Sequence, residues 1–170
     1  MRSETTVNRG ASLLVLLAWV AGGAGCGSFV ESDDKTVRAT IGATGGALHL
    51  DGLSVVVPVH ALVHTVTLSL SHPTFESPNG HAYVLDPPDT VFDVAAPAMV
   101  TIAYDAATYQ HPSEVFVATY MGGTWHSLPA AGTPEGGAAH ATTTHAGTFG
   151  LINCPGGVCP ITNADAGAEH

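Results

Sequence analysis

Strict alternation of apolar and polar residues most constrains the fold of this chain. In residues 65–71, TVTLSLS, Val66, Leu68 and Leu70 alternate with threonines and serines. Successive side chains of a β-strand point to opposite faces, so this pattern predicts a strand with one buried face. Helical periodicity is not sustained over any long window, and all eleven prolines follow Val57. The chain is therefore predicted to be rich in β-structure.

Other short strands are predicted along the chain, with turns between them. Asp51-Gly52 is a strong signal for a two-residue hairpin, and Gly122-Gly123 lies within a second hairpin. Turn signals about every eight to twelve residues are typical of an all-β, antiparallel β-sandwich, which is the expected fold. The predicted strands are residues 36–41, 47–50, 53–57, 65–71, 82–85, 99–104, 114–120, 124–128, 139–144 and 148–152.

A short apolar run near the N-terminus, residues 11–21, follows Arg2 and Arg9 and leads into small residues. A membrane-spanning helix needs about 20 apolar residues, which is more than this run supplies. A basic start, a short apolar middle and a small-residue end predict a signal-peptide helix for export.

The four residues that follow, Gly23-Ala24-Gly25-Cys26, resemble a bacterial lipobox. The resemblance implies that residues 1–25 are a lipoprotein signal peptide and that Cys26 is the lipidation site. The position three before the cysteine is usually aliphatic, and here it is Gly23, so ordinary cleavage with an unmodified Cys26 stays open. Several acyl chains on one residue would anchor the protein stably. Gly27 in place of Asp favours the outer over the inner membrane, with the domain facing the periplasm or the outside.

The negative net charge of the chain excludes some classes of binding partner. Residues 1–25 hold two of the four basic residues and one of the fourteen acidic ones, so the rest keeps Lys35 and Arg38 against thirteen acids, a net charge near −11. Nucleic acid binding needs a basic face, so nucleic acid is not an expected partner. Membrane contact should come from the lipid anchor, with residues 26–35 as an acidic tether.

The cysteine count supports a disulfide. A lipid on Cys26 would leave Cys154 and Cys159, which are predicted to pair in an oxidising compartment. A loop this short restrains the unfolded chain by about 2 kcal/mol at most. A zinc site would need two further ligands nearby. Residues 153–170 are predicted to be this turn and a disordered tail.

Several motifs follow one another in a fixed order along the chain: IGATGGALHL (41–50), LSVVVP (53–58), Ala61-Leu62, YVLDP (83–87), Phe92 before Pro97, VTIAY (100–104) and Trp125 before Leu128-Pro129. In this order they resemble a ZU-five domain, a module that recurs in ankyrins, netrin receptors and the tight-junction zona occludens protein. The resemblance covers residues 36–152 and implies a β-sandwich that interacts with other molecules. No basic patch matches the spectrin-binding role that the module has in ankyrins, so that role is not carried over.

Some relatives in that family cut themselves at a His-Phe-Ser sequence near the last strand. Here His145 is present, but Gly147 stands where the serine nucleophile would be. Glycine has no hydroxyl to attack the preceding carbonyl. Thr148 lies one residue after the position of the nucleophile, so its side chain would point to the opposite face of the strand. We therefore predict no self-cleavage.

Ten histidines are many for this length. His60 and His64 have a metal-binding spacing for a helix, but they are expected in a turn and at a strand start. His140 and His145 would face opposite sides of one strand. Surface histidines are therefore expected and no cofactor is implied, although a weak metal site stays open.

No enzyme motif is evident. The chain has neither a Gly-x-Ser-x-Gly elbow nor a phosphate-binding glycine loop before a helix. Asp86, Asp89 and Asp93 surround a Pro-Pro turn and are expected to cap it. Trp125 and Phe149 are expected in the core. The sequence thus indicates a non-catalytic, lipid-anchored envelope protein with a structural role or a role in binding a protein or a glycan. The alternatives are a metal-binding lipoprotein and a degenerate self-processing domain that has lost its nucleophile.

Overall fold

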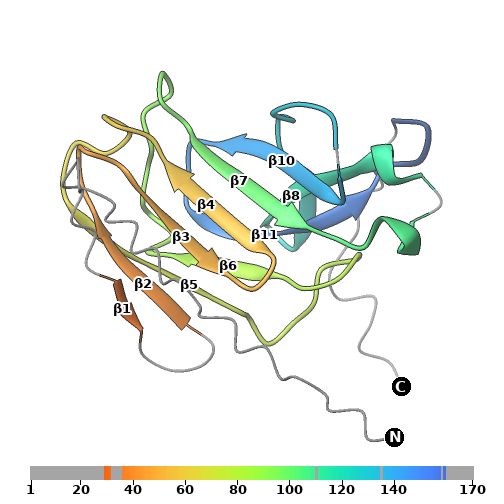
Figure 1. Cartoon of the computed structure of the whole chain (residues 1–170), viewed down its shortest axis with the longest axis horizontal. Helices are drawn as coiled ribbons and strands as arrows, with labels where there is room; N and C mark the ends of the chain where they lie inside the picture. The colour runs from red at the N-terminus through yellow and green to blue at the C-terminus, as the bar shows by residue number, and fades with distance from the viewer. Residues whose placement is uncertain (1–28, 32–35, 110, 135, 158, 160–170) are drawn as a thin grey trace, which may run out of the picture.

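Two antiparallel sheets form a sandwich in the computed structural model of the chain, which describes residues 29–31, 36–109, 111–134, 136–157 and 159 (Figure 1). The seven-stranded sheet has, in spatial order, β1 (Phe29–Glu31), β2 (Thr36–Ile41), β5 (Val66–Ser71), β6 (Tyr83–Asp86), β11 (Gly147–Asn153), β8 (Val115–Met121) and β9 (Thr124–Ser127). The four-stranded sheet has β10 (Ala138–Thr143), β7 (Ala98–Ala103), β4 (Leu53–Val57) and β3 (Gly46–Leu50). Three short 3-10 turns are η1 (Ala106–Thr108), η2 (Pro112–Glu114) and η3 (Pro155–Gly157).

This architecture confirms the predicted all-β sandwich. Each predicted strand corresponds to a strand whose ends differ from the prediction by at most one residue. The signal-peptide helix expected within residues 1–25 lies outside the described residues. Within the described part of the chain, no helix has the length and apolar character needed to cross a membrane.

One strand was not predicted. β1 lies within the stretch expected to be a tether, and it pairs antiparallel with β2, so that Val30 lies opposite Arg38. The sheet therefore begins before residue 36, the predicted domain boundary. A three-residue strand has too few residues to show alternation, so only its pairing with β2 reveals it.

The alternation in the sequence becomes the core between the sheets. In β4, Leu53, Val55 and Val57 are buried, whereas Val56 between them is 43% exposed. Leu68 and Leu70 of β5 are buried from the opposite sheet. Phe149 is buried in this core as predicted, whereas Trp125 is buried in a second apolar cluster. Burying a side chain of this size contributes about 1.5–3 kcal/mol, so these strands hold the sandwich together.

The Asp51-Gly52 hairpin forms as predicted. Leu50 pairs with Leu53 across the turn, and Asp51 has the positive backbone angle φ of 49° that such a tight turn requires. Aspartate is among the few residues other than glycine that adopt this conformation readily. The turn fixes the register of β3 on β4 and carries the Asp51 side chain to the end of the sandwich.

A second apolar cluster covers the outer face of the larger sheet. Four consecutive residues of β11, 149–152, are buried, so both faces of this strand are covered. The loop of residues 72–81 lies against the outer face, where Phe75 stacks on Tyr120 with ring centres 5.3 Å apart. The buried members of the cluster are Ala82, Ala118, Trp125, Ile152 and Cys154.

Candidate functional site

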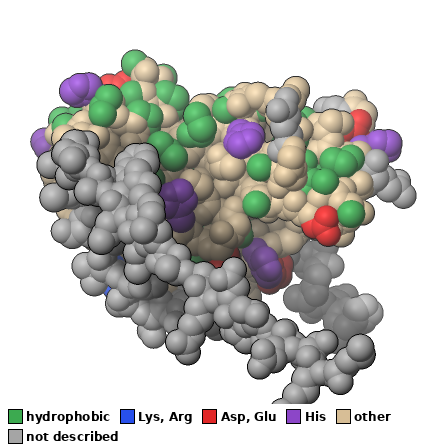
Figure 2. Space-filling view, viewed as in Figure 1, with side chains coloured by type: hydrophobic (Ala, Val, Ile, Leu, Met, Phe, Trp, Pro, Cys, Tyr) green, Lys and Arg blue, Asp and Glu red, His purple; other side chains and the backbone are tan. Residues whose placement is uncertain are grey.

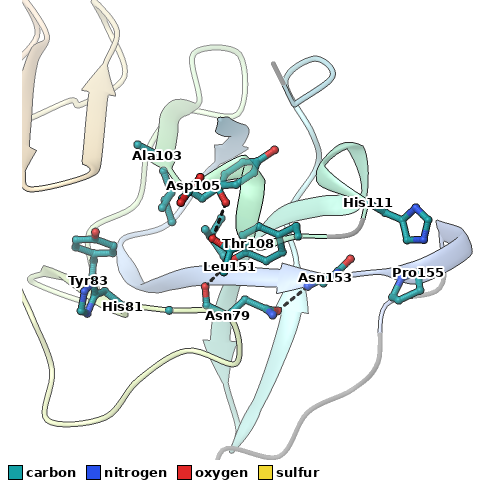
Figure 3. A pocket seen from close by; sticks show the side chains of 14 residues that line it. Asn79, His81, Tyr83, Ala103, Asp105, Thr108, His111, Leu151, Asn153 and Pro155 are labelled. Carbon is teal, nitrogen blue, oxygen red and sulfur yellow. Dashed lines mark hydrogen bonds between the residues drawn. The ribbon is translucent and has the colours of Figure 1, made fainter. Parts of the chain in front are cut away.

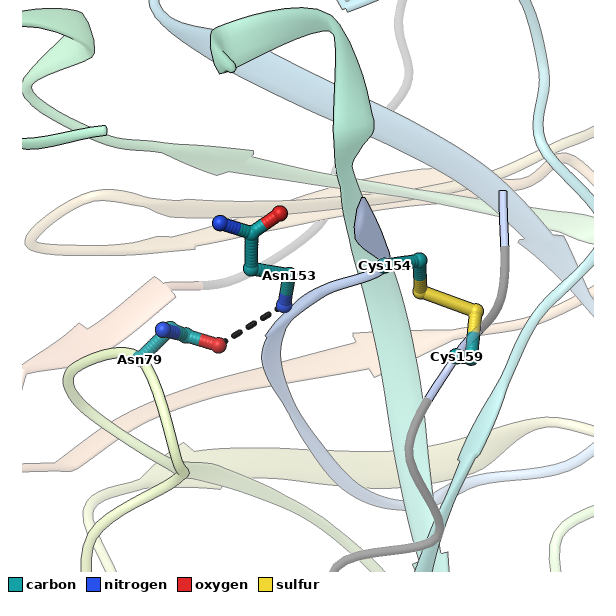
Figure 4. The surroundings of a disulfide bond; sticks show 4 residues. All are labelled: Asn79, Asn153, Cys154 and Cys159. Carbon is teal, nitrogen blue, oxygen red and sulfur yellow. Dashed lines mark hydrogen bonds between the residues drawn. A yellow bond between two sulfur atoms is a disulfide. The ribbon is translucent and has the colours of Figure 1, made fainter. Parts of the chain in front are cut away.

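The structure shows one of the two predicted cysteine sites. Cys154 and Cys159 form a disulfide just after β11, and Cys154 is fully buried in the second apolar cluster (Figure 4). The bridge therefore closes the end of the domain over the outer face of the larger sheet. The predicted lipidation site, Cys26, lies outside the described residues.

Most histidines are exposed, but His72 and His140 are half-buried, and the rings of His72 and His81 meet edge to face with centres 5.7 Å apart. Figure 2 shows those of one face separated across the molecule. His60 and His64 are exposed, and His60 occupies a turn as expected, with a φ of 65°. Among the described residues no group of three or more metal-ligating side chains is close enough to hold a metal ion.

The three aspartates at the end of β6 and in the loop after it have different structural roles. Asp93 caps its own loop, because its carboxylate accepts a hydrogen bond from the backbone N–H of Ala95 at 2.8 Å. Asp86 belongs to β6 and lies opposite Ser69 of β5. Asp89 is exposed in the intervening turn. One of the three therefore caps a turn in the way the sequence predicted.

The stretch that resembles a self-cleavage site begins β11. Gly147 lies opposite Leu85 of β6 and has a φ of 153°, which a residue with a side chain rarely adopts. The ring of His145 interacts with the neighbouring Thr144 hydroxyl at 2.9 Å. Position 147 thus combines the absence of a hydroxyl with a backbone conformation that favours glycine. The absence of self-cleavage stays a prediction.

A cavity with a volume of about 710 Å³ lies where β7 and β11 end (Figure 3). His81 and Tyr83 lie at one end of it, His111 and Pro155 lie at the other, and Asn79 and Asn153 lie between them. We call this cavity the tyrosine pocket, because its lining includes three tyrosines. Its other lining residues are Gly80, Ile102, Ala103, Tyr104, Asp105, Thr108, Tyr109 and Leu151.

The tyrosines are fixed by their surroundings. Tyr104 donates a hydrogen bond to the Pro112 carbonyl at 2.7 Å, and Tyr109 donates one to the Asn79 carbonyl at 2.8 Å. Their rings meet edge to face, with centres 5.2 Å apart. Burial raises the pKa of Tyr104 and, together with the neighbouring Tyr104, that of Tyr109. Both rings are therefore held in place as neutral side chains at neutral pH.

Tyr83 forms a more deeply buried wall of the pocket. Burial, followed by the nearby charge of Asp51, raises its pKa. Its ring also lies against His72, with ring centres 4.8 Å apart. This tyrosine therefore connects the pocket to the end of the sandwich at which Asp51 lies.

Two asparagine side chains are among the polar groups of the pocket. The Asn79 side-chain oxygen accepts a hydrogen bond from the backbone N–H of Asn153 at 2.7 Å (Figures 3 and 4). Only an oxygen can accept from an N–H, so this bond assigns the Asn79 amide and leaves its NH₂ group as a donor. The Asn153 side-chain oxygen is buried and has no hydrogen-bond partner among the described residues.

These bonds also explain how the loop of residues 72–81 docks on β11. β6 pairs with β11 only as far as Phe149, and beyond this point Ser77 and Asn79 accept from the N–H groups of Leu151 and Asn153. Side chains therefore take over the role of a neighbouring strand along this edge. Unpaired buried N–H groups are costly, so the loop both stabilises the edge and forms one wall of the pocket.

A second groove, of about 580 Å³, lies on the side of the sandwich where β8 and β10 end. Its lining is mostly apolar and includes Val94, Met121 and Leu128, together with His145 and Gly147. Val94 and Met121 are exposed. The stretch that resembles a self-cleavage site thus lines an apolar groove, away from the tyrosine pocket.

Sequence reasoning did not find the tyrosine pocket. Its walls come from three segments, residues 79–83, 102–111 and 151–155, which only the folded sheets bring together. The one local signal was the pair of tyrosines at Tyr104 and Tyr109, after a predicted strand. Aromatic residues just beyond a strand are equally consistent with core packing, so this spacing does not by itself indicate a site.

No protein-family model matches the chain, and a search of the curated proteins finds no match.

Proposed function

We propose that this chain is an exported lipoprotein, held at the cell envelope by a lipid on Cys26, whose ZU-five-like β-sandwich binds an envelope protein or glycan without catalysis. The observation that carries the binding role is the tyrosine pocket. Ligand sites are concave, largely pre-formed and of about 300–1,000 Å³, and this pocket has about 710 Å³ with fixed walls.

The lining of the pocket supports binding over catalysis. Among the described lining residues, Asp105 is the one carboxylate and no lysine, arginine or cysteine is present. Hydrolysis of a glycosidic bond usually needs two carboxyl groups on either side of the bond. An acid/base pair of this kind is not assembled around the described pocket, so the residues present suit recognition.

The anchor follows from sequence features near the N-terminus. The apolar run, the small residues and Cys26 fit a lipoprotein signal peptide. A chain with a net charge of −10 would not be drawn to anionic lipid, so a covalent lipid is the simplest way to keep it at a membrane. By the same resemblance the outer membrane is favoured, with the domain facing the periplasm or the outside.

Labelling with an alkyne fatty acid in a bacterial host tests the anchor. We expect the wild-type chain to incorporate the label and the Cys26→Ala variant to lose it. A Cys154→Ala/Cys159→Ala double variant is the matched control and should still be labelled. An unlabelled wild-type chain, or a label that remains in Cys26→Ala, would overturn the proposed anchor.

A further inference from the structure

We propose that the tyrosine pocket binds a neutral pyranose unit of an envelope glycan. This inference rests on the proposed binding function and names the class of ligand. Its support comes from the charge of the pocket, from its hydrogen-bonding groups and from its aromatic walls.

The charge of the pocket selects against anions. Asp105 is exposed at the pocket, and no lysine or arginine is present among the described lining residues, whose basic side chains are His81 and His111. Anionic groups are recognised by arginine or lysine, or by helix N-termini. A phosphate, sulfate or uronate would therefore meet repulsion from Asp105 with no lysine or arginine to offset it, which favours ligands without negative charge.

The hydrogen-bonding groups match a hydroxyl. Asn79 retains an NH₂ donor after its oxygen has accepted from the backbone of Asn153. The Asn153 side-chain oxygen is a buried acceptor without a partner among the described residues. The oxygen has almost no accessible surface, so a ligand reaches it only when the Asn153 amide turns toward the pocket. A buried polar group without a hydrogen bond destabilises the folded state, so a hydroxyl that donates to the turned amide gains a bond that the free protein lacks. A sugar hydroxyl donates and accepts at once, and can use both asparagines.

The aromatic walls match the ring of a sugar. Tyr104 and Tyr109 are perpendicular, at 86°, and their hydroxyls are already bonded to Pro112 and Asn79. What they offer a ligand is therefore their apolar ring surface. A pyranose has apolar C–H groups on its faces and hydroxyls around its edge, so it can contact rings and amides together. Because the rings are held before binding, little conformational entropy is lost.

Binding can be measured by NMR on the mature chain extracted in a detergent without sugar groups. The neutral probes are methyl α-mannopyranoside, maltose and diacetylchitobiose, titrated to millimolar concentration. Galacturonic acid is the anionic control and choline is the cationic control. We expect at least one neutral saccharide to shift the side-chain amide signals of Asn79 and Asn153, and neither charged probe to do so.

Asn153→Leu is the informative variant, because leucine has a similar shape and lacks the unpaired oxygen. It should raise the dissociation constant roughly tenfold, the effect of losing a hydrogen bond to the ligand, without lowering the unfolding temperature. Thr142→Val, which removes a hydroxyl from the second groove, is the matched control and should leave the dissociation constant unchanged.

Three results would overturn the glycan assignment: no shift with any neutral saccharide, equal affinity in Asn153→Leu, or equal shifts with choline or galacturonic acid. If Asn153→Leu does not fold, Tyr104→Leu tests the aromatic wall, and unchanged affinity in that variant would also contradict the assignment. The fatty-acid label on Cys26 is read separately, so failure of the glycan site and failure of the anchor are distinguishable.

Discussion

The ring of His72 joins the two sheets at one end of the sandwich, because its Nε2 lies 2.7 Å from a carboxylate oxygen of Asp51. Asp51 belongs to the β3–β4 turn of the smaller sheet, and His72 directly follows β5 of the larger one. The other ring nitrogen, Nδ1, lies 3.1 Å from the Ala82 carbonyl. His72 thus links the β3–β4 hairpin and the end of β5 to the loop of residues 72–81, which covers the second apolar cluster.

Asp51→Asn should weaken this tie without disturbing the turn, because asparagine also tolerates a positive φ. Asp51 is largely exposed, so we expect a loss of about 0.2–1 kcal/mol of unfolding free energy. Urea denaturation of Asp51→Asn, His72→Gln and the double variant measures the coupling. Strictly additive losses would show that the contact contributes nothing to stability.

Gly150→Ala should destabilise the domain, because a Cβ at this position would lie 2.4 Å from the Ser77 Cβ and 2.9 Å from the Trp125 ring. Overpacking of this kind costs about 1–3 kcal/mol. Gly52→Ala is the matched control, since its Cβ would meet nothing closer than 3.4 Å. Equal midpoints for Gly150→Ala and wild type in urea would show that the loop over β11 is not packed as described.

Loss of the disulfide should be tolerated. The bridge closes a loop with a sequence separation of only five residues, so Cys154→Ala/Cys159→Ala should lose about 2 kcal/mol at most through the unfolded chain. Removal of the buried Cys154 side chain adds a small packing loss. Circular dichroism of the double variant should retain the β spectrum, and an unfolded spectrum would show that the bridge holds the fold itself.

Alkaline pH should unfold the domain by way of its tyrosines. Burial raises the pKa of Tyr83, Tyr104 and Tyr109, so the folded state disfavours their ionised forms. The unfolded chain loses these protons near its ordinary pKa of about 10. The stability is fully present below that pH and is lost as the pH rises from there through the raised pKa values of the folded state. Absorbance at the tyrosinate band should rise at higher pH in folded than in urea-unfolded protein. Identical titrations would contradict the described burial.

Most of the fold was predictable because its information is local. Val66, Leu68 and Leu70 show the period of a strand directly, and Asp51-Gly52 marks a turn with two adjacent residues. The position of the loop over β11 was not predictable. Nothing in the sequence distinguishes Gly150 from the other small residues of the chain. Only in the folded chain do Ser77 and Trp125 lie against it.

In the candidate site, too, local features were predictable from the sequence and long-range contacts were not. The Cys154–Cys159 pair was predicted because a lipid on Cys26 leaves two cysteines that are close in sequence, and the bridge is present. The tyrosine pocket depends on Asn79 meeting Asn153 across more than seventy residues of sequence. No local pattern encodes a contact of that separation, because it is set by strand order and by the path of the loop.

The intact mass of the chain extracted from bacterial membranes tests the central claim, a lipid-anchored and uncleaved sandwich, most directly. We predict one species that begins at Cys26, carries an acyl mass on that residue, lacks two hydrogens because of the Cys154–Cys159 bridge and is continuous through Gly147. An unmodified Cys26, or two fragments that meet near Gly147, would contradict the account.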